Sequence, residues 1–252
     1  MRIFSYICRL NRISMNIDLF VPCNIDQFHP ETAMNTVKVL EKAGVEVNYN
    51  PDQTCCGRFA YNAGCPEEAK KLGDKFLSEF RGDRPVVCPS AACVAVIRKR
   101  YPELFFNTGN HLNVKRIEKN VFEFTEFLVN VLHCDDFGAE FPHKVTFHDS
   151  CSAQRGLGIG KEARQLLSKV KGLELLEMKQ TDMCCGGELT FALNHENVSL
   201  GMASHKVRNA MNTGAEYIVS TDMSCLMHQQ SYIDANGLPI QVVHIADVLA
   251  NF

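Results

Sequence analysis

Cysteine is the residue type with the clearest capacity for chemistry in this chain, which has 12 cysteines among 252 residues. Eight of them form two sets of the same design: a first cysteine, a Cys-Cys-Gly triplet about 30 residues later, and a last cysteine. The two sets are Cys23, Cys55, Cys56 and Cys93, and Cys151, Cys184, Cys185 and Cys225. Four thiolates are the ligand number of a zinc or an iron–sulfur site, so the spacing predicts one such site for each set.

The two sets belong to a sequence that is repeated. Four landmarks recur in the same order about 130 residues later: 19–23 against 147–151, 54–57 against 183–186, 86–93 against 218–225, and 121–128 against 242–249. A duplicated unit explains this order. We expect a first lobe over residues 17–136, a second lobe over residues 143–252, and an N-terminal extension over residues 1–16 that is not part of the fold.

Strand and helix signals alternate within each repeat. Short apolar strands are expected over residues 18–21, 45–49 and 86–87, and over 144–147, 173–176, 217–219 and 241–243. Helical patterns lie between them, and two begin at Pro30 and Pro66, since proline suits a first helical turn. The alternation predicts an α/β fold of two tandem duplicated lobes, each a small, mostly parallel sheet flanked by helices, related by a pseudo-two-fold axis.

The cysteines are expected at one edge of each sheet. Cys23 and Cys151 follow the first strands, the Cys-Cys-Gly triplets follow the second strands, and Cys93 and Cys225 follow the third strands. The carboxyl ends of parallel strands line the ligand crevice of such sheets. The glycine of each triplet would let the backbone turn tightly beside a bulky group. All four cysteines of one repeat should therefore converge on one rim.

Composition narrows the class of protein. Hydrophobic residues make up 46% and charged residues 22%, and the formal net charge is −3, so no basic surface is expected to attract nucleic acid or acidic lipid. Arg9 and Arg12 interrupt the apolar start, which argues against a secretory signal, and no apolar run reaches the roughly 18 residues of a membrane helix. We expect a cytoplasmic protein whose cysteines serve metal, cluster or redox chemistry rather than a disulfide framework.

The repeated motifs resemble those of a known family. They are residues 54–64 (TCCGRFAYNAG), 89–93 (PSAAC), 147–158 (FHDSCSAQRGLG) and 220–228 (STDMSCLMH). Together they resemble the cysteine-rich CCG domain, which occurs in the cysteine-rich subunit of heterodisulfide reductase and in the iron–sulfur subunit of glycolate oxidase. A chain made of two such units is similar to the lactate-utilisation protein A group, and the similarity runs from about residue 17 to residue 250.

The resemblance implies an iron–sulfur electron-transfer subunit of an oxidoreductase complex, rather than a complete enzyme. The implied reaction is the oxidation of L-lactate, a small 2-hydroxy acid, to pyruvate, with heterodisulfide-reductase-like or glycolate-oxidase-like electron transfer as the nearest alternatives. The implied cofactor is a [4Fe-4S] cluster, one or two per chain, bound by the eight repeated cysteines, with zinc in one lobe as an alternative. The implied partners are a ferredoxin-type iron–sulfur subunit and a third subunit.

The chain departs from the reductase pattern at two positions. In that reductase each unit ends in Cys-x-x-Cys, whereas the first cysteine of this pair is Ser90 in one repeat and Asp222 in the other. Each site is therefore expected to have four candidate thiolates rather than five. Cys88 lies two residues before Ser90 and is a candidate replacement, although Ser220 occupies its place in the second repeat.

Other interpretations of the cysteines are open at this point. Buried inert thiols, structural zinc in a non-redox scaffold, and a vicinal disulfide at each Cys-Cys pair that acts as a metal-free redox switch each fit part of the pattern. Packing or chance explains the cysteines without a counterpart in the repeat. These are Cys8, Cys65, Cys88 and Cys134.

Three polar residues near the cysteines are candidates for catalysis. His148 could move a proton or contact a substrate carboxylate, or it could bond to the backbone as a structural residue. Arg155 and Arg58 could pair with a substrate carboxylate or compensate the charge of a thiolate-bound cluster. No dinucleotide or flavin signature is present, so we expect the cluster or a partner subunit to accept the hydride equivalent.

Overall fold

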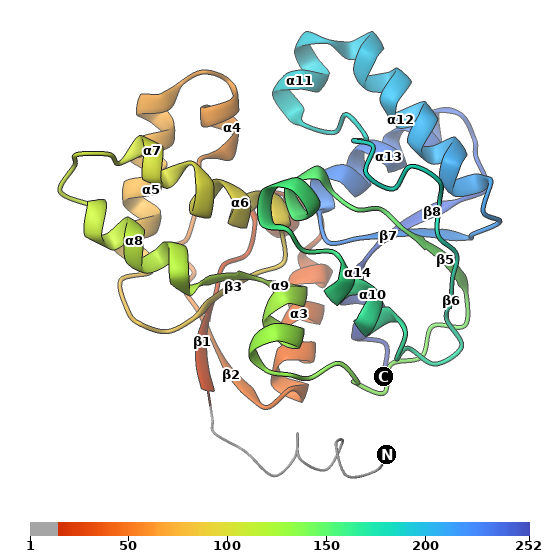
Figure 1. Cartoon of the computed structure of the whole chain (residues 1–252), viewed down its shortest axis with the longest axis horizontal. Coiled ribbons are helices and arrows are strands. Elements are labelled where there is room, and N and C mark those ends of the chain that lie inside the picture. Colours follow the sequence, from red (N-terminus) through yellow and green to blue (C-terminus); the bar gives the residue numbers. More distant parts are fainter. Residues whose placement is uncertain (1–14) are drawn as a thin grey trace.

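Each repeat of the chain forms a parallel β-sheet (Figure 1). The computed structural model describes residues 15–252, and the sheets have the strand orders β2-β1-β3-β4 and β6-β5-β7-β8. All paired strands run parallel. The strands are β1 (Met15–Leu19), β2 (Val45–Tyr49), β3 (Val86–Cys88), β4 (Val121–Glu123), β5 (Lys144–Phe147), β6 (Glu174–Leu175), β7 (Tyr217–Ser220) and β8 (Gln241–His244). The identical order confirms the predicted α/β fold of two duplicated lobes.

Helices connect the strands and cover both faces of each sheet. Those of the first lobe are α2 (Cys23–Phe28), α3 (Pro30–Lys42), α4 (Arg58–Asn62), α5 (Pro66–Glu79), α6 (Ala91–Lys99), α7 (Tyr101–Leu104), α8 (His111–Asn120), α9 (Phe124–Glu126) and the π-helical turn η1 (Phe127–Val131). Those of the second lobe are the π-helical turn η2 (Ser152–Leu157), α10 (Lys161–Leu167), α11 (Leu189–Asn194), α12 (Glu196–Met211), α13 (Met223–Ala235) and α14 (Ile245–Leu249).

Local sequence signals explain where several elements begin and end. Helices α3 and α5 begin at the prolines expected to open them, and Gly44, at φ +87°, follows the last turn of α3. Strand β1 begins at Met15, so residues 15–16 belong to the fold rather than to the expected extension. The rest of that extension, with Cys8, lies outside the described residues. Strand β6 is shorter than the run expected over residues 173–176.

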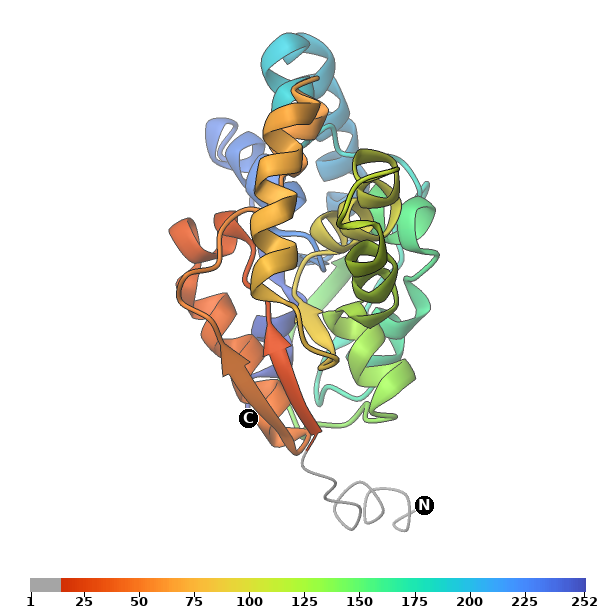
Figure 2. The same cartoon turned by 90° about the vertical axis from the view of Figure 1, so that its left-hand side faces the viewer.

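The two lobes pack against each other through matched pairs of elements. Helix α6 packs against η2, and its counterpart α13 packs against α2; in the same way α3 packs against α14 and α9 against α10. One apolar cluster contains residues of both sheets, among them Ile17, Val87, Phe147 and Val219. Figure 2 shows the first lobe in front of the second. The reciprocal contacts are those of a two-fold relation, and the lobes share one core.

The length and apolar character of the helices decide whether any of them could span a membrane. Within residues 15–252, none of the helices is both long enough and apolar enough to cross a bilayer.

Candidate metal centres

The four repeated cysteines of the first lobe come together at the carboxyl edge of its sheet. Cys23 is the first residue of α2 behind β1, Cys55 and Cys56 lie in the connection after β2, and Cys93 lies in the first turn of α6 behind β3. Their thiols form a chain of contacts from Cys23 to Cys55, from Cys55 to Cys56 and from Cys56 to Cys93. The predicted convergence of this set on one rim is therefore present in the fold.

Hydrogen bonds lower the pKa of two thiols of this set, Cys55 and Cys93. Contacts with Cys23 and Cys56 lower the pKa of Cys55, and the backbone N–H of Gly57 donates to its Sγ at 3.3 Å. The bond to Cys55, together with burial, raises the pKa of Cys23 above the usual range of a thiol. Because neighbouring thiolates repel each other in a buried place, the whole set can ionise only around a cation.

The second lobe repeats this arrangement. Cys151 follows β5, Cys184 and Cys185 lie in the connection after β6, and Cys225 lies in the first turn of α13. The Sγ atoms of Cys184 and Cys151 are 3.9 Å apart, and the N–H of Gly186 donates to Cys184 Sγ at 3.4 Å. Cys185 interacts with both Cys184 and Cys225, so the four sulfurs again form a continuous group.

The triplet glycines allow the backbone to pass close to a neighbouring helix. Gly57 has φ +81°, and a Cβ there would lie 2.9 Å from the carbonyl oxygen of Ala69 in α5. Gly186 has φ +82°, and a Cβ there would lie 3.0 Å from the carbonyl oxygen of Ser199 in α12. Both glycines are therefore required by conformation and by space, as the sequence suggested.

Cys88 joins the thiols of the first lobe, whereas Cys65 and Cys134 do not join either set. Cys88 is fully buried at the end of β3, and burial together with a hydrogen bond to Cys93 raises its pKa. Cys65 is exposed before α5, and Cys134 belongs to the apolar core shared by the lobes. The first lobe thus holds five neighbouring thiols, and the position of Cys88 two residues before Ser90 was the signal in the sequence.

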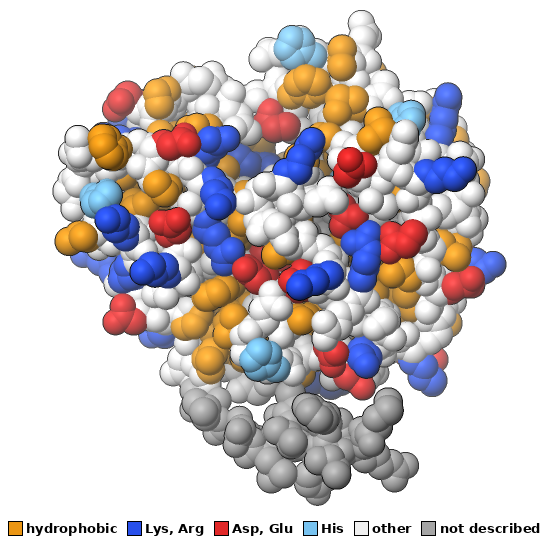
Figure 3. Space-filling view, in the orientation of Figure 1, with side chains coloured by type: hydrophobic (Ala, Val, Ile, Leu, Met, Phe, Trp, Pro, Cys, Tyr) orange, Lys and Arg blue, Asp and Glu red, His pale blue; other side chains and the backbone are white. Residues whose placement is uncertain are grey.

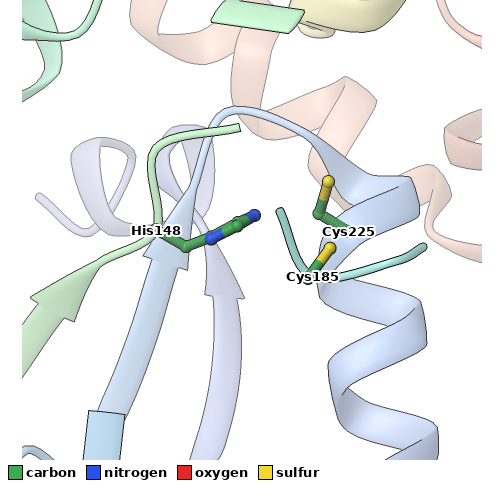
Figure 4. Close-up of side chains that lie close together, drawn as sticks. All are labelled: His148, Cys185 and Cys225. Atoms are coloured by element: carbon green, nitrogen blue, oxygen red, sulfur yellow. The ribbon is translucent and has the colours of Figure 1, made fainter. Parts of the chain in front are cut away.

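His148 lies beside the thiols of the second lobe (Figure 4). A ring nitrogen of His148 and the sulfurs of Cys185 and Cys225 all lie within 4.8 Å of one another, and the His148 ring points toward the two cysteines. The ring is fully buried, and neither of its nitrogens has a hydrogen-bond partner in the described part of the chain. Burial lowers the pKa of His148 to about 3, so the imidazole is neutral and able to bind a metal.

Ser90 and Asp222, the two positions that replace the cysteine of the reductase pattern, meet between the lobes. The Ser90 hydroxyl donates to Asp222 Oδ1 at 3.3 Å, and the backbone N–H of Ala92 donates to Asp222 Oδ2 at 3.0 Å. Asp222 is only 1% exposed, and burial raises its pKa although the nearby guanidinium of Arg58 lowers it. These two positions therefore connect the lobes rather than extend the thiol sets.

A cavity of about 670 Å³ is lined by residues of both lobes and lies beside the thiols of the second set. Its lining includes cysteines of the second lobe together with basic and acidic residues, namely Cys151, Cys184, Cys225, Arg58, Lys99, Arg100, Arg155, Glu103, Glu188 and Asp222. Figure 3 shows lysine and arginine side chains along the junction of the lobes. The Arg58 guanidinium reaches across to Ser224 Oγ at 3.4 Å. Both candidate arginines thus face this cavity, whereas His148 is not among its lining residues.

Arg58 is the cation that both sets share. Burial lowers its pKa, but the negative charges of Cys93, Asp222, Cys56 and Cys225 outweigh burial and raise the pKa above its usual value. The guanidinium therefore remains charged beside sulfurs from both lobes. A fixed positive charge in this place favours thiolates and, equally, an anionic ligand in the cavity.

The donor set of each lobe fits a thiolate-bound metal or iron–sulfur group. Four or more sulfurs converge in each, backbone N–H groups donate to Cys55 and Cys184, and a buried imidazole in the second lobe has no partner of its own within residues 15–252. Such donors and N–H bonds are the features by which proteins hold these groups.

Comparisons with known proteins agree with the cysteine pattern. The profile of the cysteine-rich domain family CCG matches residues 17–98 and 145–229, one match in each lobe. The chain is 38% identical to lactate utilization protein A 1 of Bacillus mycoides over 93% of this chain and 96% of the relative. It is 37% identical to lactate utilization protein A of Bacillus subtilis over 93% and 99%. The chain belongs to the CCG cysteine-rich domain family and to the lactate utilization protein A family.

A solved structure supports the fold of this CCG protein. A hypothetical protein from Helicobacter pylori superimposes with a TM-score of 0.64 at 10% sequence identity. The alignment covers 93% of the CCG chain but only 48% of that solved chain. At this identity the likeness concerns the fold alone, and it extends over both lobes.

Proposed function

We propose that this chain is an iron–sulfur electron-transfer subunit that takes part in lactate utilisation. The observation that carries the proposal is the pair of matched thiol sets at the carboxyl edges of the two sheets, the second of which lines a cavity that also contains Arg58 and Arg155. The names of the relatives supply the metabolic context. Bound clusters would supply one-electron transfer, and the chain itself would set their potentials through N–H bonds, burial and charge.

The residues proposed as cluster ligands are the repeated cysteines. They are Cys23, Cys55, Cys56 and Cys93 in the first lobe, and Cys151, Cys184, Cys185 and Cys225 in the second. The N–H groups of Gly57 and Gly186 would stabilise thiolate charge at Cys55 and Cys184, as they already donate to these sulfurs. Arg58 would remain protonated beside both sets and offset their negative charge.

The cavity between the lobes suits a small carboxylate. Arg58 and Arg155 present guanidinium groups, which bind carboxylates through paired N–H donors. We propose a small 2-hydroxy acid such as L-lactate as its ligand. Oxidation of L-lactate to pyruvate releases two electrons and two protons, and a cluster passes electrons singly. The proposal therefore includes partner subunits, one of them of the ferredoxin type, that accept these electrons.

Metal and sulfide analysis of anaerobically purified protein tests this function. We expect a brown protein with about four irons for each occupied [4Fe-4S]-type site. Cys55→Ser and Cys184→Ser should each lose the iron of one lobe, because each removes a sulfur at the centre of its set. Cys65→Ser, which alters an exposed cysteine outside both sets, is the matched control and should keep the full iron content.

Two outcomes would reject the iron–sulfur function. A colourless protein that contains zinc and no acid-labile sulfide would indicate a metal-stabilised scaffold. Disulfides at Cys55–Cys56 and Cys184–Cys185 that reform after reduction, detected by mass spectrometry of the alkylated chain, would indicate a metal-free switch.

A further inference from the structure

Each thiol set has one further potential ligand beside it, and this residue differs between the lobes. In the first lobe Cys88, at the end of β3, adds a fifth thiol beside Cys93. Its counterpart at the end of β7 is Ser220, whose hydroxyl donates to the backbone oxygen of His148 at 3.0 Å and is therefore occupied. The second lobe has no fifth thiol at this place among the described residues. It has a buried histidine next to Cys185 and Cys225 instead.

The position of His148 is apolar in the first lobe. The repeat aligns His148 with Phe20, whose ring packs against Phe76 with the ring centroids 5.0 Å apart. Helices α5 and α12 can be aligned in the same way, because Gly57 contacts Ala69 in α5 and Gly186 contacts Ser199 in α12. Seven residues further along, this alignment pairs Phe76 with Lys206. An aromatic pair in the first lobe is thus replaced by a fully buried histidine and a fully buried lysine in the second.

This replacement is costly unless something binds the imidazole. Both nitrogens of His148 are buried and lack a hydrogen-bond partner in residues 15–252, and each polar group left in this way destabilises a fold. Phe20 shows that an aromatic ring of similar size packs in the equivalent place. The two ring nitrogens of His148 therefore lack a partner within residues 15–252 that a bound ligand could provide.

The geometry identifies the kind of ligand. His148 and the sulfurs of Cys185 and Cys225 converge on one point from β5, the Cys-Cys-Gly connection and α13 (Figure 4). Ligand atoms on one tetrahedral metal, with bonds of about 2.0–2.3 Å, lie about 3.6–3.8 Å apart. A separation of no more than 4.8 Å is close to this arrangement, so the imidazole lies within reach of a metal atom held by Cys185 or by Cys225.

We propose that His148 is a metal ligand of the second lobe, which therefore binds its metal through thiolates and an imidazole, whereas the first lobe binds through thiolates alone. The inference rests on the proposed function only in requiring that a metal or cluster is bound here. A metal-bound imidazole carries no charge, whereas the fifth thiol of the first lobe, Cys88, would carry one; with the buried cation Lys206 nearby, this favours the reduced state of the second site and raises its reduction potential. Electrons would then pass from the first lobe to the second.

The proposal is tested on the full chain with the first lobe emptied by Cys55→Ser. Protein labelled with ¹⁵N-histidine is reduced and studied by electron–nuclear double resonance. We expect a hyperfine coupling from a histidine nitrogen that is lost in His148→Phe and in His148→Cys, and that persists in His205→Phe, a control at an exposed site on α12. We also expect the midpoint potential of the second site to shift to more negative values in His148→Cys. A nitrogen coupling absent from the His148 protein itself, or unchanged in His148→Phe, overturns the proposal whether or not either variant folds well.

The test separates this inference from the proposed function. Iron with acid-labile sulfide but no histidine coupling would overturn the role of His148 and leave the iron–sulfur function intact. Zinc without sulfide would reject that function. In that case X-ray absorption at the zinc edge decides the role of His148: imidazole scattering that disappears in His148→Phe supports ligation, and thiolate-only scattering overturns it.

Discussion

Cys55 and Cys56 are followed by a glycine that the fold requires. On an extended chain the side chains of adjacent residues point to opposite sides, yet the thiols of Cys55 and Cys56 are in contact. Directly after them the backbone turns at Gly57 with φ +81°, and the Gly57 N–H donates to Cys55 Sγ. The turn also brings the chain against α5, where no side chain fits. The triplet is therefore a local structure in which the N–H bond to Cys55 and the close approach to α5 both depend on an absent Cβ.

Gly57→Ala should destabilise the protein more than Gly44→Ala. Both glycines have a left-handed backbone, which costs a residue with a side chain about 1–2 kcal/mol. At Gly57 the new Cβ would also meet the Ala69 carbonyl oxygen at 2.9 Å, whereas at Gly44 nothing lies within 4 Å. We expect a further loss of roughly 1–3 kcal/mol in Gly57→Ala by chemical denaturation, together with a loss of first-lobe iron. Equal losses of stability and full iron in both variants would contradict this account.

The two groups of four repeated cysteines could be predicted from the sequence. The positions of Cys88 and His148 beside these thiols could not, although both residues were candidates. Duplication identifies residues that occur twice, and Cys88 and His148 have no counterpart of the same type. Their placement depends on which way each side chain turns at the end of its strand, and this is a property of tertiary packing. A histidine in a repeat position that is otherwise aromatic was the one available signal for His148.

The ends of helices illustrate which local structures the sequence determines. Proline at the start of α3 and α5 and Gly44 after α3 act on their own backbone, so these boundaries could be predicted. The π-helical turns η1 and η2 could not, because no residue type specifies them and both lie where the lobes meet. The start of helix α9 could be predicted only in part. Its cap is formed by two nearby glutamates, Glu123 and Glu126, but the burial of Glu123 depends on tertiary packing.

Glu123→Gln should make the stability of the protein depend less on pH. Glu123 accepts hydrogen bonds from Thr125 N at 2.8 Å and Glu126 N at 3.1 Å at the start of α9, and it is fully buried. Burial raises its pKa to about 8. A carboxyl with a raised pKa stabilises the fold below its unfolded pKa and loses that stabilisation as pH rises toward the folded value, by up to about 1.4 kcal/mol per pH unit.

The measurement is the free energy of unfolding of both proteins between pH 5 and pH 8. The glutamine keeps an acceptor for the N–H groups and cannot ionise, so the stability of Glu123→Gln relative to the original chain should rise steadily with pH. Glu118→Gln, at an exposed position on α8, is the control and should show a constant difference. A difference for Glu123→Gln that is equally constant would mean that this carboxyl is already ionised in the fold.

At the scale of the whole molecule, the duplicated lobes form one structure because their faces are apolar and complementary. The repeat predicts two similar units, and the exchanged contacts of α6 with η2 and of α13 with α2 follow from a two-fold relation between them. The polar contact on this axis could not be predicted, because Ser90 and Asp222 are the same repeat position occupied by different residues. Their difference lets one donate a hydrogen bond to the other.

Asp222 connects the lobes and also compensates the charge of Arg58, so its loss should affect both stability and the metal centres. In Asp222→Ala the N–H of Ala92 loses its acceptor at 3.0 Å, and the guanidinium of Arg58 loses a buried counter-ion. We expect the free energy of unfolding to fall by about 2–4 kcal/mol. Asp222→Asn keeps the shape and one acceptor oxygen, so it should lose less. Both variants should alter the visible absorption of the metal-loaded protein, since Arg58 lies beside sulfurs of both lobes.

Asp247→Ala is the matched control for this prediction. Asp247 also links the lobes, through hydrogen bonds of 2.9 Å from Thr32 and from Asn35, but these residues belong to α3 and α14 rather than to the cysteine edges. Its loss should weaken the interface and leave the metal spectrum unchanged. An Asp222→Ala protein that unfolds and absorbs like Asp247→Ala would mean that Asp222 only joins the two lobes. A changed spectrum in Asp222→Ala alone would mean that Asp222, through Arg58, also sets the charge around the bound metal, because Arg58 interacts with Asp222 and with sulfurs of both lobes.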